Sequence, residues 1–195
     1  MKQDLNKEFW TQRYNEGTIG WDVGKASTPI TTFIDQLANK ELKILIPGAG
    51  NAYEAEYLWK KGFNDVYVLD ISPVPLDNFK KRNPEFPEHQ LLLMDFFELK
   101  NNFDLVIEQT FFCAIPRNLR PDYAKKMHEV IKPGGKLAGV LFGIEFEKEG
   151  PPFGGTKEEY IKYFEPYFDI KVYEEAYNSI KPRAGRELFI NFVRK

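Results

Sequence analysis

Cysteine and histidine are scarce in this 195-residue sequence, which contains one Cys and two His. A lone Cys113 cannot form an intrachain disulfide bond, so we expect a protein of the reducing cytoplasm. Cys113 lies in an apolar run and is expected to be a small core residue. A structural zinc ion requires about four Cys or His ligands, and His89 and His128 are too few to complete such a set. We therefore expect no metal site.

Long apolar runs and an excess of one charge are also missing. No segment is apolar enough to span a bilayer, and residues 1–5 do not resemble a signal peptide, so we expect no membrane association. The 27 Lys and Arg nearly balance the 29 Asp and Glu, and the two signs are interleaved along the chain. This pattern disfavours nucleic acid as a partner. We expect a small-molecule or anionic substrate, and a monomer or weak dimer.

The apolar residues that are present favour one domain. A hydrophobic content of 43% is sufficient for a full-sized core, and no Ser- or Gly-rich linker divides the chain. We predict a single domain over residues 1–195, with two helices in residues 1–40 and a core in residues 41–195. Strands are predicted near 43–47, 65–70, 90–94, 103–108 and 136–142, and helices near 4–16, 28–39, 52–61, 73–82 and 120–131.

Alternating strands and helices predict an α/β fold with a Rossmann-like, doubly wound sheet that is mostly parallel and has helices on both faces. The C-terminal part of the chain differs from this pattern. A helix near 156–165 is followed by strands near 168–173 and 187–193 with no helix between them. Strands joined without a crossover helix are most simply antiparallel, so the sheet is predicted to end in an antiparallel pair.

The turn after the first predicted strand indicates a nucleoside site. Residues 43–52 read Lys-Ile-Leu-Ile-Pro-Gly-Ala-Gly-Asn-Ala, and the next apolar run closes at Asp70. Gly48 and Gly50 let the backbone approach a ligand, and the Asp70 carboxylate can accept both ribose hydroxyl protons. A dinucleotide fingerprint has a third glycine where this chain has Tyr53, which favours S-adenosylmethionine over NAD. A nicotinamide-dependent oxidoreductase and a non-catalytic binding protein are the alternatives.

Five spaced motifs extend over nearly the whole chain. They are residues 9–14 (Phe-Trp-Thr-Gln-Arg-Tyr), 20–22 (Gly-Trp-Asp), 111–116 (Phe-Phe-Cys-Ala-Ile-Pro), 119–123 (Leu-Arg-Pro-Asp-Tyr) and 150–153 (Gly-Pro-Pro-Phe). With the order of elements, they resemble the class I S-adenosylmethionine-dependent methyltransferases of the thiopurine S-methyltransferase family. The first motif reads Pro-Gly-Ala-Gly rather than Pro-Leu-Cys-Gly, which is more similar to the plant halide and thiol methyltransferases. The resemblance implies S-adenosylmethionine as the cofactor.

The predicted cofactor residues follow the strands. Gly48 and Gly50 are expected to line the methionine and ribose portions of the cofactor, although both also suit an ordinary turn. Asp70 is expected to hold the ribose, and the alternative is a cap on the following helix together with Ser72. These residues share one expected edge of the sheet.

Two further pairs follow the third and fourth predicted strands. The Asp95 carboxylate can accept a proton from the adenine amino group, and the Phe96 ring can cover the adenine face. Glu108 and Gln109 are expected to face the cofactor's ammonium group or backbone, with a solvated strand end as the alternative. The usual residues of the family at this pair are an Asp and an aromatic residue.

The aromatic residues near the N-terminus have two interpretations. Trp10, Tyr14 and Trp21 suit core packing of the first two segments. By the resemblance, they instead form a lid of the cofactor site, where aromatic faces meet the sulfonium and exclude water. We expect the lid.

The acceptor is predicted to be a small soft nucleophile, namely a thiol, bisulfide, halide or thiocyanate. Such a nucleophile needs no proton removed in the transition state, which agrees with the lack of an evident histidine base. Tyr14 is the candidate catalytic residue, and it or an arginine could polarise a thiol. The remaining candidates for the substrate pocket are Phe111, Phe112, Phe153, Arg117 and Arg186. A thiopurine-like heterocycle, a metalloid oxyanion and an oxygen or nitrogen nucleophile are the alternatives.

Overall fold

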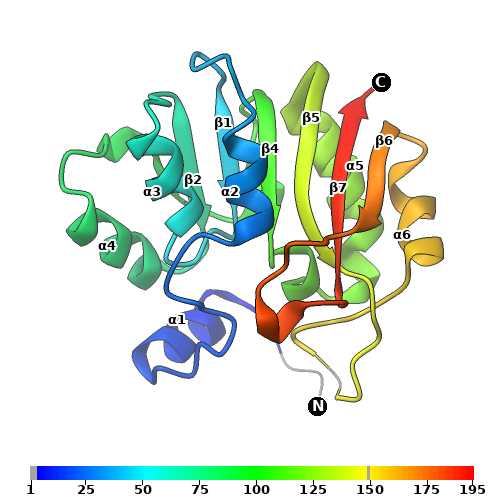
Figure 1. The fold of residues 1–195 in the computed structure, drawn as a ribbon. Helices are drawn as coiled ribbons and strands as arrows, with labels where there is room; N and C mark the ends of the chain where they lie inside the picture. Colours follow the sequence, from blue (N-terminus) through cyan, green and yellow to red (C-terminus); the bar gives the residue numbers. More distant parts are fainter. Residues whose placement is uncertain (1–3, 149) are drawn as a thin grey trace.

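The computed structural model describes residues 4–148 and 150–195 and contains one sheet flanked by helices (Figure 1). The longer helices are α1 (Lys7–Asn15), α2 (Thr28–Ile34), α3 (Tyr53–Lys60), α4 (Pro73–Arg82), α5 (Arg120–Val130) and α6 (Lys157–Phe164). The strands are β1 (Ile44–Pro47), β2 (Val66–Asp70), β3 (Leu91–Leu93), β4 (Phe103–Gln109), β5 (Ile131–Phe142), β6 (Phe168–Glu175) and β7 (Glu187–Arg194).

The seven strands have the spatial order β3-β2-β1-β4-β5-β7-β6. Strands β1 to β5 pair in parallel, whereas β7 is antiparallel to both β5 and β6. The mostly parallel sheet with a C-terminal antiparallel pair is therefore confirmed. The sequence prediction did not specify that β7 lies between β5 and β6. The more buried β7 occupies the inner position, and β6, with more exposed side chains, forms the edge.

Alternating side chains of the strands fill two cores, one on each face of the sheet. Ile44 and Ile46 of β1 pack with helices α2, α3 and α4, while Leu45 packs with α5 and α6 on the opposite face. Helices on both faces agree with the doubly wound prediction. Over residues 4–148 and 150–195, every helix is too short or too polar to cross a membrane.

Two predicted boundaries were wrong. The second helix ends at Ile34 rather than near residue 39, because Asp35 and the residues after it form turns instead of another helical repeat. The fifth strand begins at Ile131 rather than near residue 136, directly after α5. The Lys-Pro-Gly-Gly segment at 132–135 lies within this strand, and the pairing register shifts beside it between Phe103 and Leu105 of β4.

The carboxyl ends of the parallel strands meet at one edge of the sheet, and α1 lies beside that edge at the lower left of Figure 1. Short connections follow β1, β2 and β4 there, so the residues after each strand are brought together although they are distant in the sequence. In open α/β sheets, ligands bind at this edge.

Candidate active site

A cavity of about 610 Å³ opens at the carboxyl edge of the sheet. Its floor is the turn after β1, where Gly48 and Gly50 have φ angles of 55° and 54°. A Cβ atom at Gly48 would lie 2.1 Å from the ring of Phe111, and one at Gly50 would lie 2.7 Å from the Tyr14 hydroxyl oxygen. Glycine is therefore required at both positions, by the left-handed backbone and by the close approach of two aromatic side chains.

Asp70 ends β2 and lies buried beside this turn. One carboxylate oxygen accepts the Gly50 N–H at 2.9 Å, and the other accepts the Ser72 N–H at 2.8 Å. Asp70 thus braces the start of α4 and the glycine turn at the same time. A carboxylate has about four acceptor positions, so two remain for ligand hydroxyl groups. Burial raises the pKa of Asp70 to about 6, although the backbone N–H groups oppose the shift.

The residues after β3 form the next wall of the cavity. Asp95 and Phe96 both line it, as does Met94. The Asp95 carboxylate accepts the Phe97 N–H at 2.9 Å and is otherwise exposed. The Phe96 ring is buried in edge contact with Phe111, at a centroid distance of 5.3 Å. A carboxylate and an aromatic wall are thus adjacent, as predicted for an adenine site.

Glu108 and Gln109 point to opposite faces of β4, and only Gln109 lines the cavity. Gln109 accepts the Ser27 hydroxyl at 3.0 Å. Glu108 is fully buried, and the expectation that it faces the cofactor is wrong. Its carboxylate accepts the Phe111 N–H at 2.8 Å, the Phe112 N–H at 2.9 Å and the Tyr123 hydroxyl.

Burial raises the pKa of Glu108 to about 7, and its three hydrogen bonds oppose the rise. The same burial, together with the adjacent carboxylate, raises the pKa of Tyr123. Since both groups lie within the core, Glu108 organises the segment after β4 instead of contacting a ligand in the cavity.

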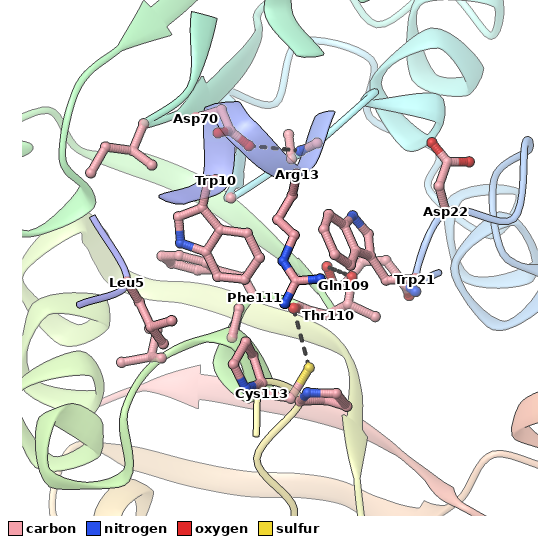
Figure 2. A pocket seen from close by; sticks show the side chains of 18 of the residues that line it. Leu5, Trp10, Arg13, Trp21, Asp22, Asp70, Gln109, Thr110, Phe111 and Cys113 are labelled. Atoms are coloured by element: carbon pink, nitrogen blue, oxygen red, sulfur yellow. Dashed lines mark hydrogen bonds between the residues drawn. The ribbon is translucent and has the colours of Figure 1, made fainter. Parts of the chain in front are cut away.

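Residues 4–22, which we call the lid segment, include the predicted aromatics Trp10, Tyr14 and Trp21, and all three line the cavity. Figure 2 shows Trp10 and Trp21. Trp21 packs edge-on against Trp10 at 5.5 Å and against Tyr14 at 5.8 Å. The segment is attached to the domain by a hydrogen bond of 2.7 Å from Arg183 to the Trp21 carbonyl. The three aromatics are only half-buried and line the cavity. They are not residues of the two main cores.

Tyr14 is a poor candidate for a base. Burial, and then the nearby Asp70, raise the pKa of Tyr14 well above its usual value. The phenol therefore keeps its proton at neutral pH. Cys113 also lines the cavity, and its thiol lies 3.2 Å from the Thr110 carbonyl oxygen. Burial raises its pKa to about 12, so this thiol stays neutral.

The cavity wall includes some predicted acceptor residues and excludes others. Phe111 and Arg186 line it. Wall residues that were not predicted individually include Phe142, Phe146, Pro151, Pro152 and Arg183. Arg183 is buried and donates to Glu187 at 3.3 Å as well as to the lid segment.

Phe112, Phe153 and Arg117 lie outside the cavity, so their predicted place in it was wrong. Phe112 is buried in the core against Tyr123. Two hydrogen bonds fix the Phe153 backbone. Its N–H donates to the Cys113 carbonyl, and its carbonyl accepts from Arg120. Arg117 forms an exposed ion pair with Glu145.

Arg13 was missed by the sequence reasoning. It lines the cavity from α1, between Trp10 and Tyr14 in sequence (Figure 2). A single arginine on a short helix resembles a solvated surface charge. The signal that could have identified it is its spacing, because residues 10, 13 and 14 share one face of a helix.

The glycine turn and the two strand-end carboxylates around one cavity define a nucleoside-binding α/β enzyme. Among solved structures, magnesium protoporphyrin IX methyltransferase from Synechocystis PCC 6803 matches this fold with a TM-score of 0.75. The match covers 99% of this chain and 98% of that one, at 14% sequence identity. It confirms the Rossmann-like fold of the methyltransferases.

The sequence profile of the thiopurine S-methyltransferase family matches residues 5–189, and the chain belongs to this family. Probable thiol methyltransferase 2 of Arabidopsis thaliana is 30% identical over 184 residues, covering 91% of this chain and 81% of the relative. Thiocyanate methyltransferase 1 of Brassica oleracea is 29% identical over 193 residues, covering 96% of this chain and 85% of the relative. The chain is thus an S-adenosylmethionine-dependent methyltransferase, as its motifs predicted.

Proposed function

We propose that this enzyme transfers a methyl group from S-adenosylmethionine to a small soft nucleophile: a thiol, bisulfide, a halide or thiocyanate. The observation that carries the proposal is that Tyr14 and Cys113, which line the cavity, keep their protons and that neither histidine lines it. The relatives named thiol and thiocyanate methyltransferases support the same acceptor class. A nucleophile that arrives as an anion needs no base.

The residues at the strand ends fit the cofactor. Asp70 would hold the ribose hydroxyl groups with its two remaining acceptor positions, and Asp95 would accept from the adenine amino group. Phe96 would cover the adenine face. Gly48 and Gly50 line the cavity, and the methionine portion would lie beside their turn.

When bound, S-adenosylmethionine supplies an electrophilic methyl group, which the acceptor takes as the carbon–sulfur bond breaks and its electron pair stays on the sulfur of S-adenosylhomocysteine. The chain's own contribution is to hold the acceptor in line with that bond. Trp10, Tyr14 and Trp21 exclude water from the reacting atoms. Good positioning alone can lower such a barrier by about 7 to 11 kcal/mol.

Three titratable groups of the cavity, Tyr14, Cys113 and Asp70, are unsuited to removing a proton from the acceptor. The raised pKa values of Tyr14 and Cys113 keep both groups neutral. The Asp70 carboxylate is turned toward two backbone N–H groups at the cofactor end. Neither His89 nor His128 lines the cavity. A thiol acceptor would therefore lose its proton to water before transfer, and a halide or thiocyanate would need no such step.

The test is turnover of a panel of acceptors with detection of S-adenosylhomocysteine. Calorimetry should first give a cofactor affinity in the micromolar range, about -8 kcal/mol. We expect methylation of bisulfide and small thiols, with slower methylation of iodide or thiocyanate. Thiopurines, metalloid oxyanions, amines and alcohols complete the panel. Turnover confined to oxygen or nitrogen acceptors would contradict the proposal, and cofactor binding without any turnover would indicate a non-catalytic binding protein.

A further inference from the structure

Arg13 is a charged side chain inside an otherwise aromatic part of the cavity. In Figure 2 it extends from α1 between the rings of Trp10 and Trp21 and points away from Asp70. Its guanidinium carbon lies 5.1 Å from the centroid of the Phe9 ring. Within residues 4–148 and 150–195, no hydrogen bond and no ion pair engages this guanidinium group. A half-buried cation thus faces the cavity without an anion.

Two other charged residues of the cavity wall, Arg183 and Asp22, differ from Arg13 because their side chains have partners. Arg183 donates to the Trp21 carbonyl and to Glu187. Asp22 accepts the Gly24 N–H at 2.6 Å and the Asn51 side chain. The charges of these side chains are used to fix the lid segment and the loops. Arg13 has no comparable structural function, and its five N–H donors remain available for a ligand.

We propose that Arg13 binds the negative charge of the methyl acceptor and makes the enzyme selective for anions. The inference rests on the proposed function, since it assigns a residue to the acceptor named there. The bound cofactor brings a sulfonium, and a second cation in the same cavity is repelled unless an anion lies between them. An anion that lies between the guanidinium and the methyl group is attracted by both positive charges. For a thiol acceptor, the guanidinium favours the bound thiolate, whose proton has gone to water.

The carboxylate of the cofactor's methionine portion is the other anion that could meet Arg13. The geometry favours the acceptor, because the guanidinium points away from Asp70 and the turn at Gly50, which form the cofactor end. Thr110 and Cys113 lie on the side toward which it points. Arg183 and Arg186 of the β6–β7 connection also line the cavity.

The experiment uses thiocyanate as the anion and the full-length protein saturated with S-adenosylhomocysteine. Calorimetry measures thiocyanate binding to the wild type and to Arg13→Gln, Arg13→Lys and Lys7→Gln. Lys7 is an exposed residue of α1 outside the cavity, so Lys7→Gln is the matched control for the loss of one charge. We expect Arg13→Gln to weaken thiocyanate binding about tenfold or more, because a hydrogen bond to a charged group is lost.

The accompanying results distinguish the roles. Arg13→Lys should retain thiocyanate binding within about threefold, and Lys7→Gln within about twofold, since the first keeps the charge and the second lies outside the site. The affinity of Arg13→Gln for S-adenosylhomocysteine should be unchanged, and its KM for thiocyanate should rise with little change in kcat. Thermal unfolding of each variant verifies that it is folded.

Three binding results would overturn the inference. The first is that the wild-type complex binds no thiocyanate. The second is that Lys7→Gln weakens thiocyanate binding as much as Arg13→Gln does. The third is that Arg13→Gln weakens the binding of S-adenosylhomocysteine instead of the binding of thiocyanate. The last result would assign Arg13 to the cofactor carboxylate. A wild type that binds thiocyanate through Arg13 but methylates no thiol or anion would contradict the proposed function, and it would overturn the assignment of this anion site to the methyl acceptor.

Discussion

The two ends of the cavity are built in different ways. At the cofactor end, Gly50 and Asp70 follow neighbouring parallel strands, and one hydrogen bond of 2.9 Å joins them. At the acceptor end, the walls come from α1, the segment after β4, the loop at Pro151 and the connection between β6 and β7. Strand ends are fixed by the sheet, whereas the acceptor end depends on contacts between distant segments. Substitutions at one end should therefore leave the binding function of the other end largely intact.

Removal of residues 1–22 should have the largest effect and separate the two ends. We expect turnover to be abolished, because Trp10, Tyr14 and Trp21 are lost and water enters the cavity. The Asp70 and Asp95 carboxylates remain, so the truncated protein should still bind S-adenosylhomocysteine, although more weakly. Calorimetry and product detection on the same sample measure both quantities.

The control is the circular dichroism of the truncated protein, which should retain the signature of the α/β core. In the full-length protein, the fluorescence of Trp10 and Trp21 should change on cofactor binding. Activity retained after truncation would mean that these aromatics only pack against the domain.

Replacing Glu108 tests whether the acceptor end depends on its buried support. Glu108→Ala leaves the N–H groups of Phe111 and Phe112 and the Tyr123 hydroxyl without their acceptor. We expect a loss of about 2 to 4 kcal/mol in the free energy of unfolding. Urea unfolding measures this loss. Glu108→Gln retains an acceptor oxygen and should lose much less, and equal losses in the two variants would argue against these hydrogen bonds.

Glu108 also makes stability depend on pH. Its pKa is about 7 in the folded state and near 4.5 when unfolded, so the folded state binds the proton more tightly. This contribution to stability is fully present below about pH 4.5 and is lost as the pH rises to about 7. The melting temperature of Glu108→Gln should therefore fall less than that of the wild type over this range. Parallel curves for the two proteins would contradict the assignment.

Asp70 tests the cofactor end alone. We expect Asp70→Ala to weaken binding of S-adenosylmethionine by about 1.5 to 3 kcal/mol, because charge-assisted hydrogen bonds to the ribose are lost. At saturating cofactor, the KM for the acceptor should stay close to that of the wild type. An unchanged cofactor affinity in folded Asp70→Ala would remove this residue from the site.

The pH dependence of cofactor binding is a second test of Asp70. Its pKa is raised to about 6 by burial, and the ionised carboxylate is the better acceptor for hydroxyl groups. Affinity should thus rise as the pH increases through about 6, and Asp70→Asn should remove this rise. Calorimetry at a series of pH values compares the two proteins.

The smallest effect is expected for Cys113. Its thiol has a pKa of about 12 because it is buried, so it should react with iodoacetamide much more slowly than a free cysteine at neutral pH. Cys113→Ala should change turnover of a thiol by less than about twofold, since the thiol has no role in the transfer. Rapid alkylation of the folded protein would contradict both the burial of the Cys113 thiol and its raised pKa.

The strand-end residues could be predicted because their positions depend on local sequence. Asp70 and Asp95 each close an apolar run, and the carboxyl ends of parallel strands share one edge. Glu108 was assigned wrongly, although the two-residue period of a strand allows only one of Glu108 and Gln109 to face the cavity. The buried partner Tyr123 lies fifteen residues away, and nothing in the local sequence indicates that contact.

The acceptor end was predicted less well because several candidate residues lie in loops. Arg186 lines the cavity, whereas Arg117 pairs with Glu145 outside it. Arg13 and Arg183 were missed, because their positions depend on how the lid segment and the β6–β7 connection pack together. The sequence alone does not distinguish which of several loop residues with the same charge lies at the cavity, because that depends on this packing.

The central claim is that the acceptor reacts as an anion and that no group of the enzyme removes its proton. The most direct test is the pH dependence of kcat/KM at saturating S-adenosylmethionine, measured for a cysteine-like thiol and for iodide. The thiol profile should rise as the free thiol ionises, with a midpoint near pH 8.5, while the iodide profile should stay nearly flat. A rise shared by both acceptors would contradict the claim and point to an ionising group of the enzyme.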